Sequence, residues 1–110
     1  MDPSEAAWAR LAATLSNDPR VDPPEAAKAR GFGSKGLKVA RKLFAFRSSK
    51  GKLVLKLSAA RVEELELKCV GARYDPGHGR LMKEWLALDV KEKARWLRLA
   101  REALEHACGG

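Results

Sequence analysis

The sequence predicts a small two-layer α+β domain in which helices cover one face of an antiparallel sheet. Its 110 residues, 45% of them hydrophobic, suit one compact core and a single domain spanning residues 1–110. Apolar residues recur at helical spacing near both ends and once in between, which indicates three amphipathic helices. Apolar and basic residues alternate between the first two of these segments, as is typical of strands. The expected order is helix, two or three strands, helix, one or two strands, helix.

The first helix is expected at the N-terminus. Pro3 suits the first helical position, and Trp8, Leu11 and Leu15 then fall on one face. Prolines follow this segment and favour a loop. Residues 1–30 are therefore interpreted as an N-terminal helix and a proline-rich loop.

Two strands are predicted over residues 42–47 and 52–57, joined by a short turn that contains glycine. In the second strand every other residue is a leucine, from Leu53 to Leu57, and these leucines alternate with Lys52, Val54 and Lys56. We expect the leucines to face the helices and the lysines to face solvent. Residues 37–39 are a candidate third strand.

A second helix is predicted after Ser58, which is a suitable N-cap, and Gly71 is expected to end it. Residues 81–88 then follow as a strand, in which apolar residues again alternate with polar ones.

Asp89 is predicted to cap the last helix, because Glu92 three residues later completes a capping box. Trp96 is part of the apolar stripe of that helix. Residues 36–107 are thus expected to hold the sheet and two helices, with residues 108–110 as a tail.

Positive charge is concentrated in one stretch of the chain. The protein has 22 Lys and Arg against 14 Asp and Glu, a formal net charge of +8. No acidic residue stands between Ala26 and Val62, where 11 of the basic residues lie. Much of this stretch is the predicted hairpin, so its cations are expected to form one surface for a polyanion.

We expect this surface to contact the phosphates of nucleic acid, with DNA as the first candidate. The chain has one Asn and no Gln, the side chains that usually read adenine, so binding is expected to tolerate many sequences. A merely solvated face, whose lysines discourage edge pairing, is the alternative. The candidate contacts are Lys35, Lys38, Arg41, Lys42, Arg47, Lys50, Lys52, Arg80 and Lys83.

No enzyme, cofactor or metal chemistry is predicted. Residues 31–36 spell Gly-x-Gly-x-x-Gly, but a strand is expected after them where the dinucleotide-binding fold needs a helix. The two histidines and two cysteines fit no zinc-binding spacing. The acidic N-terminus is unlike a signal peptide. The sequence contains no run of about 18 apolar residues, the length that a membrane-spanning helix needs. A cytoplasmic protein is expected.

Two other functions stay open. One-sided charge also suits an interaction module that binds an acidic protein or pairs with itself as a homodimer through an open sheet edge. A small-molecule pocket is the third candidate, and its expected lining is Phe44, Phe46, His78 and Trp85.

Three segments carry a family resemblance. Residues 36–57, the run Ser58–Leu65 and the run Asp75–Trp85 resemble the paired strands, helix and loop of the TfoX N-terminal domain and of YjbR (MmcQ)-like proteins. The resemblance covers roughly residues 30–107. It implies a two-layer α+β domain with helices on one face of an antiparallel sheet. Some members of these families are described as DNA-binding or as competence regulators.

Overall fold

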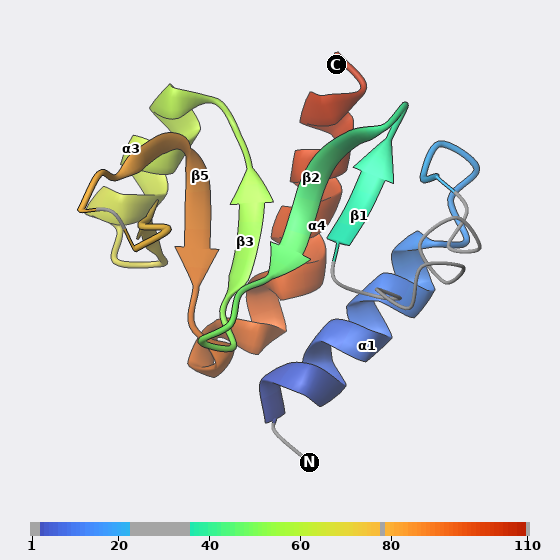
Figure 1. Cartoon of the computed structure of the whole chain (residues 1–110), viewed down its shortest axis with the longest axis horizontal. Coiled ribbons are helices and arrows are strands. Elements are labelled where there is room, and N and C mark those ends of the chain that lie inside the picture. Colours follow the sequence, from blue (N-terminus) through green and yellow to red (C-terminus); the bar gives the residue numbers. More distant parts are fainter. Residues whose placement is uncertain (1–2, 23–35, 78, 110) are drawn as a thin grey trace.

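The computed structural model describes residues 3–22, 36–77 and 79–109, which form one α+β domain, as predicted (Figure 1). Within them lie three α-helices, five strands and one 3₁₀ turn. In chain order these are α1 (Pro3–Leu15), β1 (Gly36–Val39), β2 (Lys42–Arg47), β3 (Leu53–Lys56), α3 (Ala59–Leu67), β4 (Ala72–Tyr74), β5 (Met82–Leu88), η1 (Val90–Glu92) and α4 (Lys93–Ala107).

The five strands form one antiparallel sheet in the order β1-β2-β3-β5-β4. The predicted hairpin of β2 and β3 is confirmed, and so is the additional strand at β1. β5 pairs with β3, and β4 lies at the far edge. With β4, two strands lie between α3 and α4, which agrees with the expected one or two. No residue range is predicted for β4, because three residues are too few for an alternation to be recognised.

The helices pack on one face of this sheet and share a single apolar core with it. α4 crosses behind β2 and β3, α3 packs on β4 and β5, and α1 lies against α4 (Figure 1). The largest fully buried apolar side chains of this core are Trp96, Phe44, Leu53, Leu55, Leu57, Leu86, Leu88, Leu99, Leu104 and Val62.

Burial confirms the predicted register of β3. Leu53, Leu55 and Leu57 are each at most 1% exposed and belong to the core, whereas Lys52 is exposed. Val54 differs from the expectation of an open lysine face. It lies on the face opposite the helices and is nevertheless fully buried, so other side chains must cover it there.

A β-bulge at Phe44 separates two phenylalanines of β2. The register with β1 shifts by one residue at this point, which leaves Phe44 without a partner of its own. A bulge interrupts the alternation of a strand. As a result the consecutive residues Phe44 and Ala45 are both buried in the core. Phe46 lies on the opposite face, where it pairs with Val54.

The prediction that Gly71 ends the second helix is wrong. Cys69 is the residue that takes the left-handed backbone conformation, with a φ of 60°. The N–H groups of Cys69 and Val70 donate to the carbonyl oxygens of Glu66 and Leu65, which is the double hydrogen bond of a Schellman motif. A cysteine therefore occupies the position that glycine usually takes.

The last helix begins later than predicted, because Asp89 caps the 3₁₀ turn η1 instead of α4. The Asp89 carboxylate accepts a hydrogen bond from the N–H of Lys91 at 3.1 Å, and α4 starts at Lys93. The indole Nε1 of Trp96 donates to the carbonyl oxygen of Asp89 at 3.1 Å. This hydrogen bond joins the turn η1 to Trp96, which is buried in the core as the apolar stripe of the helix predicts.

The turn between β1 and β2 is held by a distant carboxylate. Ala40 and Arg41 both have positive φ, 50° and 69°, which two-residue hairpin turns require and which glycine or asparagine usually supplies. The side chain of Asp22 accepts hydrogen bonds from both backbone N–H groups, at 3.0 Å to Ala40 and 2.8 Å to Arg41. The N–H of Asp22 donates to the carbonyl oxygen of Lys38 at 2.8 Å.

We expect the substitution Asp22→Ala to lower the free energy of unfolding by about 1–2 kcal/mol, because two charge-assisted hydrogen bonds to a strained turn are lost. Urea denaturation followed by circular dichroism measures this. The double substitution Ala40→Asn/Arg41→Gly should restore most of that loss in the Asp22→Ala background, since that pair favours the turn by itself. Failure of this rescue would show that the carboxylate does not act through the turn.

Candidate nucleic-acid interface

On the sheet face opposite the helices, one row of paired residues contains a single large side chain among small ones. Strand pairing aligns Gly36, Phe46, Val54, Ala87 and Ala72 across all five strands. Phe46 is the only aromatic residue of this row. Its small neighbours leave space above the sheet into which side chains from other rows can lean.

Phe46 brings together aromatic rings from three strands, here called the aromatic cluster (Phe46, Tyr74 and Trp85). The ring centroids of Phe46 and Tyr74 are 5.5 Å apart with planes at 83°, an edge-to-face contact. Those of Phe46 and Trp85 are 5.8 Å apart at 58°. All three side chains are partly exposed, while Val54 is fully buried and Ala87 is 9% exposed. The cluster therefore accounts for the burial of these two residues.

Lys56 lies at the edge of the cluster. Its Nζ is 5.5 Å from the ring centroid of Trp85, a cation–π distance, and 3.2 Å from Oε1 of Glu84. A cation over the indole means that this ring face meets a polar group instead of the apolar core.

Exposed cations lie on the same face as the aromatic cluster and at the two turns of the hairpin. Lys38 and Lys52 lie on the cluster's own face, because Lys38 alternates with Gly36 and Lys52 with Val54. None of the exposed predicted contacts makes an ion pair with another residue that the structure describes. These exposed predicted contacts are Lys38, Arg41, Lys42, Lys50, Lys52, Arg80 and Lys83.

Two predicted contacts, Lys42 and Arg47, lie on the helix side of the sheet, and Lys42 pairs there with the buried Val39. Arg47 pairs with Leu53 on the core side of the sheet, and its Nε donates to the hydroxyl oxygen of Ser4 in α1 at 3.1 Å. Ser4 is only 2% exposed, so Arg47 is engaged in joining the sheet to α1. Lys35 lies outside the described residues.

The hairpin spaces its cations along the sheet. Arg41 and Lys42 lie at the β1–β2 turn, and Lys50 lies at the β2–β3 turn, at the opposite end of β2 (Figure 1). A strand of six residues spans about 20 Å. The basic surface is therefore long enough to follow several successive phosphates.

The structure separates the residues expected to line a small-molecule pocket. Phe44 is fully buried in the core, Phe46 and Trp85 lie in the aromatic cluster on the other face, and His78 is outside the described residues. Two cavities of about 260 and 320 Å³ lie on the helix side instead, and none of these aromatic residues lines them.

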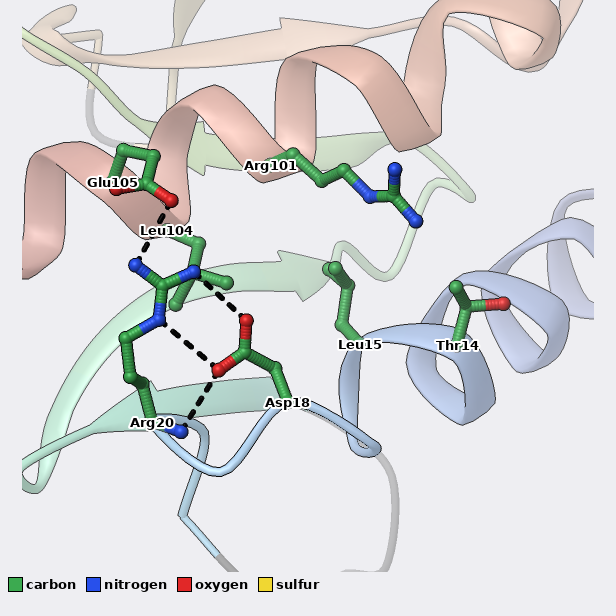
Figure 2. A pocket seen from close by; sticks show the side chains of 7 residues that line it. All are labelled: Thr14, Leu15, Asp18, Arg20, Arg101, Leu104 and Glu105. Carbon is green, nitrogen blue, oxygen red and sulfur yellow. Dashed lines mark hydrogen bonds and ion pairs between the residues drawn. The ribbon is translucent and has the colours of Figure 1, made fainter.

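The smaller cavity lies between the end of α1 and α4 and is occupied at its rim by an ion-pair network (Figure 2). The guanidinium of Arg20 lies 2.8 Å from Asp18 and 2.9 Å from Glu105. The hydrogen bonds that the side chain and the backbone N–H of Arg20 donate to Asp18 lower the pKa of Asp18 to about 2. The carboxylates of Asp18 and Glu105 are both paired with Arg20. We therefore interpret the network as a link between the loop after α1 and the last helix.

Tyr74 is a residue of this face that sequence patterns did not single out, whereas the alternation predicts a solvent-facing Lys56 without placing it among the candidate contacts. Tyr74 is the one aromatic residue of the three-residue strand β4 at the sheet edge. Its ring meets that of Phe46 because of the strand order, which no local pattern predicts. Lys56 belongs to the basic stretch, and its alternation with Val54 was the available signal.

Comparisons with known proteins add no assignment: no family model matches the chain, and neither a curated protein nor a solved structure shows significant similarity to it. The resemblance to TfoX N-terminal and YjbR-like proteins stays a prediction. No helix in the described part of the chain is long and apolar enough to span a membrane.

Proposed function

We propose that this protein is a non-enzymatic domain that binds nucleic acid, DNA in the first instance, through the sheet face opposite the helices. The observation that carries the proposal is that the exposed Lys38 and Lys52, which make no ion pair with the described residues, share that face with the partly exposed aromatic cluster. Such a surface offers phosphates several positive charges, and binding is favoured because the counterions condensed on the nucleic acid are released when its phosphates are neutralised.

The proposed contacts are cations that are exposed in the structure. Lys38 and Lys52 lie beside the aromatic cluster, and cations of the two hairpin turns and of the β5 region extend the surface. Arg47 is left out because it hydrogen-bonds Ser4 on the helix side. Most of these residues are lysines, which contact phosphates as point charges, so the expected binding is weak, sensitive to salt and tolerant of sequence.

A cytoplasmic location is part of this proposal, and two exposed free cysteines, Cys69 and Cys108, are compatible with a reducing compartment. The resemblance to TfoX N-terminal and YjbR-like proteins, some of which bind DNA, agrees with it.

Titration of a fluorescently labelled duplex across salt concentrations tests the proposal. If about five phosphates are engaged, log K should fall against log salt concentration with a slope of roughly −4 to −5. Absence of binding at low salt would refute the proposal.

Charge reversal on the two faces of the molecule separates a specific surface from net charge. Lys38→Glu/Lys52→Glu changes two exposed lysines on the aromatic face, and Lys91→Glu/Arg98→Glu changes two exposed cations of η1 and α4 on the helix side. Both variants alter the net charge equally. The first should lose at least about tenfold in affinity and flatten the salt slope by about 2, and the second should bind nearly as the wild type does. Equal losses would show that only net charge matters.

A further inference from the structure

We propose that the aromatic cluster (Phe46, Tyr74 and Trp85) stacks against unpaired bases, so that the domain prefers single-stranded nucleic acid to duplex. This inference rests on the proposed function and names the form of nucleic acid that the same face takes. Its starting point is a feature that phosphate binding does not need, namely aromatic rings left partly exposed among lysines.

The rings are placed where the fold can hold them firmly. Phe46 stands on β2, Tyr74 on β4 and Trp85 on β5, so three strands of one sheet carry them. The contacts at 5.5 and 5.8 Å fix the rings against one another, and Val54 lies buried next to Phe46 in the sheet. A platform of this kind loses little side-chain entropy when a base stacks on it.

Lys56 shows how such a platform would exchange its occupant. In the protein alone its ammonium lies 5.5 Å from the Trp85 ring centroid and 3.2 Å from Glu84. A base offers the indole a larger stacking surface than an ammonium does, and the displaced lysine remains on a flexible stem that reaches a neighbouring phosphate. The ring and the cation therefore serve adjacent parts of one nucleotide.

Duplex nucleic acid cannot use this arrangement. Its bases are stacked on one another and expose only their edges in the grooves, whereas unpaired bases present whole faces to aromatic side chains. The lysines bind the phosphates of either form, but only a single strand also engages the aromatic cluster. We therefore expect single strands to bind roughly 5- to 150-fold more tightly for each base that stacks, as far as stacking alone decides.

The test compares labelled single-stranded oligothymidine, oligouridine and a duplex of equal length by fluorescence anisotropy at one salt concentration. The variant Trp85→Leu keeps an apolar cover over the sheet but removes the indole, and Trp85→Phe restores an aromatic ring. Leu67→Ala removes an exposed apolar side chain, 79% exposed, from α3 and is the matched control. Thermal unfolding of each variant confirms that it is folded, and Phe46→Leu provides a second variant should Trp85→Leu fail to fold.

We expect the wild type to bind the single strands more tightly than the duplex. Trp85→Leu should lower the affinity for single strands at least fivefold and leave the affinity for the duplex unchanged. Trp85→Phe should recover the affinity for single strands, and Leu67→Ala should not change it. Equal binding of oligothymidine and oligouridine would mean that the protein contacts the bases and phosphates only. A preference for one of them would mean that the sugar is contacted as well, in addition to the stacked bases. Single strands and duplex that bind equally, with Trp85→Leu unchanged, would overturn the stacking and leave the phosphate surface intact. Loss of binding to all three ligands at low salt would overturn both proposals.

Discussion

The substitution Phe44→Ala is expected to lower the free energy of unfolding by about 3–5 kcal/mol, as the truncation of a large buried aromatic side chain usually does. Phe44 is fully buried among the core residues that the helices cover, because the bulge turns it away from the aromatic face. Urea denaturation followed by circular dichroism measures the loss. This loss is a large part of the roughly 5–15 kcal/mol by which folded domains are usually stable.

Phe46→Ala is the matched control, since it removes the same side chain two residues later on the same strand. Phe46 is partly exposed on the opposite face, so its truncation should cost less than about 2 kcal/mol. It should instead weaken binding to single strands, which Phe44→Ala leaves unchanged in molecules that remain folded. Equal losses of stability in the two variants would mean that the bulge is absent and that both rings share one face.

Gly71→Ala is expected to lower the free energy of unfolding by about 1–3 kcal/mol, for a reason unrelated to backbone conformation. A methyl group at this position would lie 2.8 Å from the carbonyl oxygen of Ala87, 2.9 Å from a methyl of Leu86 and 3.0 Å from one of Leu88. The first of these is backbone and cannot move aside without displacing β5. Gly71 thus allows the chain to pass close to the strand.

Cys69→Gly is the opposite case and should raise the free energy of unfolding by about 0.5–1 kcal/mol, because it relieves a positive φ at the end of α3. Thermal denaturation of the two single variants measures both effects. If glycine at position 69 destabilises the protein while alanine at position 71 is tolerated, the helix ends where the sequence pattern placed it, and the observed Schellman motif is wrong.

Local patterns were sufficient for most of the fold. The spacing of Trp8, Leu11 and Leu15 predicts α1, and the alternation along β3 predicts which side chains enter the core. Hydrophobic periodicity is a property of a segment, and one buried face per segment is enough to orient it on its neighbours. The basic character of the hairpin could be predicted for the same reason, since lysines at alternate positions of a strand share one face, although a cation at an intervening position, such as Arg47, lies on the other.

The tertiary structure decided the features that depend on pairing between distant segments. The bulge that separates Phe44 from Phe46 arises from the register of β1 with β2, and Tyr74 reaches Phe46 only because β4 follows β5 at the sheet edge. Likewise, Arg47 is directed to Ser4 by the docking of α1. A sequence window records which side chains alternate along one strand, but the residue lying across from them is set by strand register and strand order. The sequence by itself thus determined an α+β domain with a basic hairpin, and only the assembled sheet placed aromatic rings at the centre of that surface.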